Sequence, residues 1–128
     1  MKGRVKKLQR IFKAEVKKIG EQAHDMIEKN IIILFEENAP AELEEISVIH
    51  RKEYFTDNIK TGDKFKIDDE VFEILSVGDA ANENLDNIGH CSLKFNGKNE
   101  AELPGDVSLE IATPPEIKTG TLLEVIRE

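Results

Sequence analysis

Short strand-like segments follow one another closely along the chain, and the turns between them constrain its fold more than any other feature. After a Thr-Gly-Asp turn at 61–63, Phe65 and Ile67 alternate with lysines. An Asp-Asp turn at 68–69 then leads into a second segment over 71–77. Alternation of apolar and polar residues with a period of two is typical of strands with one buried face. This stretch therefore predicts a β-hairpin.

The other segments extend this pattern to most of the chain. A second hairpin is predicted where Asn96-Gly97 supplies a two-residue turn and a Pro-Gly break follows Leu103. Pro40 and the glutamates after it predict one short turn of helix, and residues 21–29 can form a short helix or a turn. We predict an all-β barrel or sandwich of about seven short strands with one or two short helices. The remaining predicted strands cover 12–16, 31–35, 47–49, 91–95, 107–111 and 122–126.

The length of 128 residues corresponds to one domain, which we assign to residues 12–128. Residues 1–11 form a basic lead, for which the spacing of Val5, Leu8 and Phe12 offers a helix as one option. The longest apolar run has five residues, at 31–35, whereas a membrane-spanning helix needs about 20. A secretion signal requires an apolar stretch after its basic start, and no such stretch follows the basic lead. We therefore expect a cytoplasmic protein.

Charge is distributed unevenly along the chain. Residues 1–18 hold eight Lys or Arg and one acid, Glu15, a local charge of +7. Residues 19–128, with ten basic and 25 acidic side chains, carry −15. An acidic body disfavours nucleic acid as a partner and favours basic proteins. The basic lead is interpreted as a solvated terminal segment, and contact with anionic lipid or nucleic acid stays open for it.

Few residues are available for nucleophilic or redox chemistry. Cys91 is the single cysteine, so an internal disulfide and a multi-cysteine zinc site are excluded. The sequence contains no P-loop, no dinucleotide-binding glycine pattern, no His-Glu-x-x-His helix and no serine elbow. Three histidines remain, of which His24 lies in a stretch with the pattern of a surface helix. The candidates for chemistry are therefore His50 and His90.

The two candidate histidines lie on strand-like segments. Cys91 and Leu93 share one face of their predicted strand, which places His90 on the other face. His50 closes a β-branched run, so we expect it at the end of a strand and partly buried. A neutral imidazole is a competent nucleophile at neutral pH, and its phosphorylated form can pass the phosphate on. For each histidine, a plain surface or core role remains the alternative.

Two blocks of sequence carry a resemblance to a known family. One is ILFEENAPAELEEISVIH, residues 33–50, and the other is NLDNIGHCSLKFNGKNEAELPG, residues 84–105. With the linking VGDAAN segment, they resemble the glucitol/sorbitol-specific IIA components of the phosphoenolpyruvate-dependent sugar phosphotransferase system. The resemblance begins near Phe12 and continues to the C-terminus, so residues 1–11 lie outside it.

The resemblance implies that the chain is a phosphoryl carrier acting through a phosphohistidine. The histidine that closes the first block, His50, is implied as the phosphate acceptor, and we predict a supporting role for His90. Where relatives can have a second histidine two positions later, this sequence has Lys52, which can supply positive charge to the phosphate. No metal or other cofactor is implied, because positioning and electrostatics accomplish most of phosphoryl transfer.

The resemblance also implies the partners. Phosphate would pass from phosphoenolpyruvate through enzyme I and HPr to this chain, and then to a cysteine in the IIB part of a glucitol/sorbitol permease (IIB/IIC), with only peripheral contact at the membrane. Ile46, Val48 and Ile49 suggest an apolar centre for the surface that meets HPr, with an acidic rim at 42–45. Both candidate rings are expected to open onto one shallow depression. The oligomeric state stays open, with a homo-oligomer as one option.

Two alternatives from other functional classes remain at this point. A non-catalytic β-barrel that binds a small ligand would need a pocket but not His50. A metal-binding barrel would need a third ligand close to His50 and His90.

Overall fold

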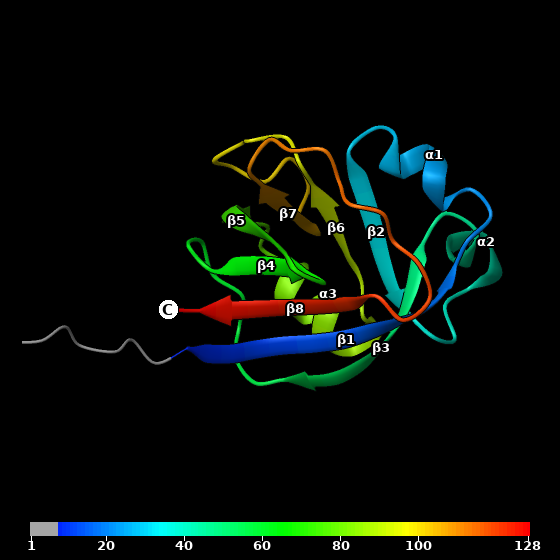
Figure 1. Ribbon diagram of the computed structural model, residues 1–128, viewed down its shortest axis with the longest axis horizontal. Coiled ribbons are helices and arrows are strands. Elements are labelled where there is room, and N and C mark those ends of the chain that lie inside the picture. The colour runs from blue at the N-terminus through cyan, green and yellow to red at the C-terminus, as the bar shows by residue number, and fades with distance from the viewer. Residues whose placement is uncertain (1–7) are drawn as a thin grey trace, which may run out of the picture.

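The computed structural model describes residues 8–128, which fold into one closed eight-stranded β-barrel with three short helices (Figure 1). Around the barrel the strand order is β1-β3-β2-β6-β7-β5-β4-β8, and β8 closes onto β1. The helices are α1 (Ala23–Ile27), α2 (Ala41–Glu44) and α3 (Ala81–Ile88). The strands are β1 (Gln9–Ile19), β2 (Ile31–Glu36), β3 (Val48–Phe55), β4 (Lys64–Ile67), β5 (Glu70–Val77), β6 (Cys91–Lys94), β7 (Asp106–Leu109) and β8 (Leu122–Arg127).

The barrel confirms the predicted all-β class. It has eight strands and three helices, whereas the sequence predicted about seven strands and one or two helices. The β4–β5 hairpin forms as predicted, with Lys66 opposite Val71. The second predicted hairpin is wrong, because β6 pairs antiparallel with β2 and parallel with β7. Gly97 does turn the chain, at a φ of 70°, but its N–H donates to the Leu109 carbonyl 2.9 Å away. The segment after it lacks the alternating apolar residues that a returning strand needs.

Alternation along the strands fills the barrel interior. On β1, Phe12, Ala14 and Val16 are buried while the residues between them are half-exposed, as the sequence predicts. On β2, Ile32 and Leu34 belong to the central core. Phe35 is also buried, but on the outer face of the same strand. The sheet is therefore covered on both faces around β2, which confirms the prediction made from its continuous apolar run.

At the start of the described chain the structure differs from the sequence-based prediction, whereas after Pro40 the two agree. β1 begins at Gln9, so residues 9–11 are extended and not helical, while residues 1–7 of the proposed helical lead lie outside the described residues. α2 begins directly after Pro40, in agreement with the short helical turn expected there. In Figure 1, α1 and α2 lie together at the side of the barrel opposite the C-terminus.

The longest helix, α3, was missed by the sequence-based prediction. It buries Ala81 and Leu85, which are four residues apart, and it ends at Gly89 in the left-handed conformation. Asn82 ties it to the loop after β3, since its side chain accepts from the Ile59 N–H at 2.7 Å and donates to the Ile59 carbonyl at 3.0 Å. None of the helices formed by residues 8–128 has the length and apolar character of a membrane span.

Candidate functional site

His50 lies inside the barrel, near the middle of its sheet. It is the third residue of β3, opposite Val16 of β1 and opposite Glu36 of the parallel neighbour β2. Its ring points to the same interior as Val48 and meets Phe12 edge-on, with ring centroids 6.1 Å apart. The side chain is 0% exposed. The expectation of a partly buried residue at a strand end is therefore wrong, because pairing with β1 continues the strand to Phe55.

The backbone of Gly89 fixes the tautomer of this histidine. The Nε2 atom of His50 lies 2.8 Å from the Gly89 carbonyl oxygen. A carbonyl oxygen can only accept, so Nε2 carries the proton and donates it, and the neutral ring keeps its lone pair on Nδ1. Within residues 8–128, Nδ1 is buried and has no hydrogen-bond partner. The site thus holds a neutral imidazole with one nitrogen engaged and the other free.

Burial also sets the protonation state. Removal from water lowers the pKa of His50 below its ordinary value of 6.5. The hydrogen bond to Gly89 acts in the opposite direction, and the positive charge of Lys52 lowers the pKa further. The ring is therefore neutral at physiological pH, which is the form in which imidazole is a nucleophile.

This lowered pKa predicts a pH-dependent stability. Between pH 7.5 and 5.5 the unfolded chain protonates His50 more readily than the folded one, so the free energy of unfolding should fall as the pH falls below about 6.5. The charged groups on this side of the sheet are Lys52 on β3 and Glu36 on β2, whose charged atoms lie 3.9 Å apart. Urea denaturation at both pH values should show a smaller decrease for His50→Gln. An equal decrease would contradict the burial effect.

Lys52 lies two residues beyond His50 on the same side of β3. Its Nζ donates to the Asp86 carbonyl at 2.7 Å and lies 3.9 Å from a Glu36 carboxylate oxygen. The lysine therefore links β3 to the C-terminal end of α3, where exposed carbonyls attract a cation. It brings one positive charge next to the imidazole.

The structure brings His50 and His90 to the same part of the sheet but on opposite faces. Burial of Cys91 and Leu93 confirms the predicted outward orientation of His90. Its ring stacks on Phe35 at 4.3 Å, and its Nδ1 lies 3.1 Å from the Leu34 carbonyl oxygen. The two rings therefore do not share one depression, because strand alternation places one inside the barrel and the other outside. What connects them is the backbone, since the Gly89 carbonyl that holds His50 directly precedes His90.

Gly89 is a site residue whose role the sequence indicated only in part, since a glycine before His90 lets another backbone or a ligand approach closely. It adopts a φ of 66° at the end of α3, and a Cβ added there would lie 2.1 Å from the Glu36 side chain and 2.8 Å from the Glu36 backbone nitrogen. No other residue fits this position without displacing β2 or α3. The signal was present in the sequence, as a glycine that follows an Ala81–Leu85 helical spacing and precedes His90.

Of the three apolar residues predicted at the centre of the surface that meets HPr, Ile46 is half-buried and the other two are buried. Val48 and Ile49 are buried, at 0% and 2% exposure. Glu44 is engaged in an ion pair with Lys18, at 2.7 Å. Val48 belongs to the barrel core, and Ile49 is buried on the opposite face of β3, so neither can contact a partner.

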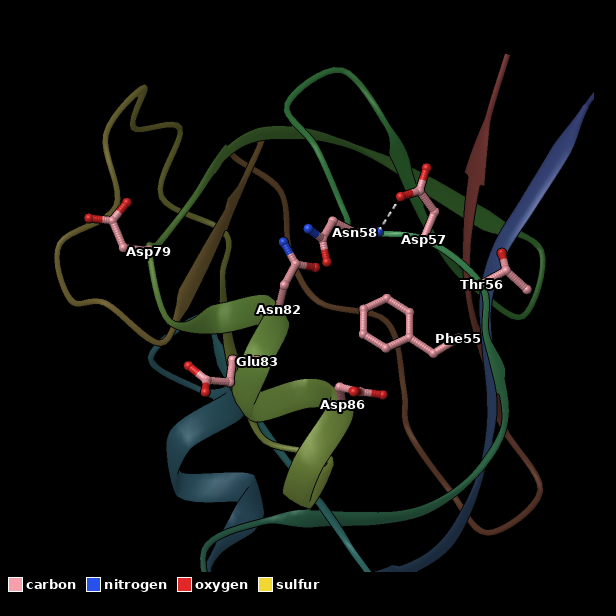
Figure 2. A pocket seen from close by; sticks show the side chains of 8 residues that line it. All are labelled: Phe55, Thr56, Asp57, Asn58, Asp79, Asn82, Glu83 and Asp86. Atoms are coloured by element: carbon pink, nitrogen blue, oxygen red, sulfur yellow. Dashed lines mark hydrogen bonds between the residues drawn. The ribbon is translucent and has the colours of Figure 1, made fainter.

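A pocket of about 470 Å³ lies along one flank of α3 (Figure 2). Figure 2 shows Asn82, Glu83 and Asp86 of α3 opposite residues 55–58, with Asp79 at one side. Asp57 is paired with Arg127 at 2.9 Å, and Asp86 lies 3.8 Å from the Lys52 Nζ. With four carboxylates in its wall, this pocket repels a phosphate group.

The geometry also bears on Cys91 and on the metal-binding alternative. Burial raises the pKa of the Cys91 thiol to about 12, so the thiolate does not form at neutral pH. Across the described residues, no three His, Cys, Asp or Glu side chains are grouped so as to hold a metal ion.

Comparison with known proteins identifies the family of this chain. Residues 11–124 match the family described as "PTS system glucitol/sorbitol-specific IIA component". Proteins named "PTS system glucitol/sorbitol-specific EIIA component" from Shigella flexneri and Escherichia coli (strain K12) are each 34% identical over 114 residues, which is 89% of this chain and 93% of theirs.

A solved structure supports the same assignment at the level of the fold. The crystal structure of a PTS system IIA component from Enterococcus faecalis V583 superimposes with a TM-score of 0.73 at 31% sequence identity. The match covers 87% of this chain and 96% of that one. The eight-stranded barrel described here therefore belongs to the glucitol/sorbitol-specific IIA components of the sugar phosphotransferase system.

Proposed function

We propose that this IIA component accepts a phosphoryl group from phospho-HPr on His50 and passes it to the IIB cysteine of a glucitol/sorbitol permease. The observation that carries the proposal is a neutral imidazole whose Nε2–H is held by the Gly89 carbonyl. Its single fixed tautomer leaves one nitrogen with a lone pair for attack on phosphorus. Such a carrier works beside the membrane, in peripheral contact with the permease.

The transfer needs no net proton exchange at His50. As the imidazole nitrogen forms its bond to phosphorus, the P–N bond of the donor histidine breaks, and the donor nitrogen keeps the electron pair. The ring of His50 gains positive charge in this step, which strengthens the bond from its Nε2–H to the Gly89 carbonyl. The ammonium group of Lys52, a short distance away, offsets part of the phosphate charge.

The observed conformation is closed to a donor. With His50 at 0% exposure, attack through Nδ1 requires the cover over the ring to move, whereas attack through Nε2 requires the hydrogen bond to Gly89 to break. The Nε2 route involves the junction between the end of α3 and β6, where Gly89 lies. Local openings of this kind are common where a helix end has few buried contacts.

His90 supports the acceptor from outside the barrel in this proposal. Its stacking on Phe35 and its contact with the Leu34 carbonyl anchor the backbone that begins at Gly89. It is thus a positioning residue and does not touch the phosphate. Replacing it should slow acceptance without removing it, since a positioning group contributes less than the nucleophile.

The experiment that tests the function is reconstitution of the relay. The chain is incubated with enzyme I, HPr and labelled phosphoenolpyruvate, and the label is followed by its acid lability and its stability to base. We expect stoichiometric labelling that depends on HPr and is lost when purified IIB is added. Absence of label in the complete mixture would contradict the proposal.

A further inference from the structure

We propose that a groove beside Gly89, at the C-terminal end of α3, is the docking site for HPr. This inference rests on the proposed function and deepens it by naming the surface that receives the donor. The groove has a volume of about 540 Å³. Its apolar wall comes from Phe35, Pro40, Leu43 and Ile88, which belong to β2, the start of α2 and the end of α3.

Apolar side chains are exposed to solvent in this groove. Leu43 is 37% exposed and Ile88 is 49% exposed, and both line the same hollow. Single exposed apolar residues are ordinary, but two that converge on a groove with an aromatic floor form the kind of patch that a protein partner covers. Val48 and Ile49, which the sequence suggested for this purpose, are buried.

The groove lies close to His50 in the fold. Glu36 lines the groove and pairs in register with His50, and Ile88 lines it directly before Gly89. A donor seated here places its phosphate at the seam between β2 and the end of α3, next to the Gly89 carbonyl that accepts from the Nε2–H of His50. The acidic pocket has four carboxylates in its wall and the groove has two, so the pocket repels the donor phosphate more strongly. Both groove carboxylates lie close to a basic group, Glu37 at 2.8 Å from Arg51 and Glu36 at 3.9 Å from Lys52.

Both sequence blocks that carry the family resemblance meet in this groove. Residues 35–40 and Leu43 come from the first block, whereas Asn87 and Ile88 come from the second. The parallel pairing of β2 with β3, and the antiparallel pairing of β2 with β6, bring these distant segments together.

Charge indicates the chemistry of the partner. The chain carries a net charge of −8, and the groove has Glu36 and Glu37 in its wall with exposed Glu42 beyond it on α2. The complementary surface is an apolar protrusion flanked by basic side chains. A groove of this size takes only a few side chains, so the contact should be small, fast and weak, as a relay requires.

The test compares variants of the full chain in phosphate transfer from phospho-HPr. The double variant Leu43→Ser with Ile88→Ser should lower the second-order rate by about tenfold or more, while its final level of labelling stays complete. The matched control is Val71→Ser with Ile111→Ser, because these side chains are 48% and 77% exposed and lie outside the groove. The control should transfer at the wild-type rate.

The outcomes separate the docking site from the function itself. Equal rates in the two double variants, or a loss confined to the step toward IIB, would overturn the docking site while leaving the phosphocarrier intact. Failure of the wild-type chain to accept phosphate would overturn the proposed function, and the docking site with it. Chemical-shift changes on addition of unphosphorylated HPr should centre on Leu43 and Ile88, and changes centred on the acidic pocket would also overturn the inference.

Discussion

His50→Gln should reduce phosphate acceptance to background while the barrel stays folded. Glutamine has nearly the same reach as histidine and can still donate an N–H to the Gly89 carbonyl, so the buried polar contact survives. Its amide is not a nucleophile. Labelling with HPr and enzyme I measures acceptance, and circular dichroism with urea denaturation measures the fold. His50→Ala should give the same loss of labelling with a larger loss of stability, because it leaves a cavity and an unpaired carbonyl.

The other two histidines provide the controls for this experiment. His24 is exposed on α1, away from the site, so His24→Gln should label normally. His90→Gln should label fully but more slowly, in keeping with a positioning role. Stable, acid-labile label on a folded His50→Gln protein would show that another residue accepts the phosphate.

Gly89→Ala should be the most damaging conservative substitution outside His50 itself. The new methyl group would meet Glu36 at 2.1 to 2.9 Å, in a backbone conformation with a φ of 66°. Left-handed strain and overpacking together should lower the free energy of unfolding by about 2–4 kcal/mol. The shifted carbonyl would also release the His50 ring, and the rate of phosphate acceptance should fall by about tenfold to a hundredfold.

Gly120→Ala separates backbone strain from overpacking as causes of the loss of stability. Gly120 also has a positive φ, of 95°, but nothing lies within 4 Å of its added Cβ. This variant should therefore show the backbone strain without the clash and without any change in phosphate acceptance. Equal losses of stability in Gly89→Ala and Gly120→Ala, with phosphate acceptance at the wild-type rate in both, would contradict this prediction. The close packing of Gly89 on Glu36 would then play no role in phosphate acceptance.

Much of the fold was accessible from local patterns in the sequence. The hairpin of β4 and β5, the inward face of β1 and the short helix after Pro40 all follow from alternation and turn chemistry that act within a few residues. The outward face of His90 follows from the same alternation.

What could not be predicted depends on contacts between distant segments. The pairing of β6 with both β2 and β7 is decided by barrel closure, and no local signal at Asn96-Gly97 reveals it. The burial of His50 depends on the closeness of Phe12 and Gly89, which lie 38 and 39 residues away along the chain. The helix α3 was overlooked because its few apolar residues give only a weak periodic signal over eight residues.

The arrangement around β2 has a consequence for how the protein acquires its activity during folding. The ring of His50, the proposed acceptor, comes from β3, and the carbonyl that orients it comes from the turn before β6, so the two meet only after β2 has paired on both sides. Contacts between residues so far apart in the chain form slowly, because the entropy of closing the intervening loop opposes them. Nascent chains that have not yet emerged beyond β6 would lack the Gly89 contact altogether. Competence to carry phosphate should therefore arise late, together with closure of the barrel, and partly folded chains would not draw phosphate away from the relay.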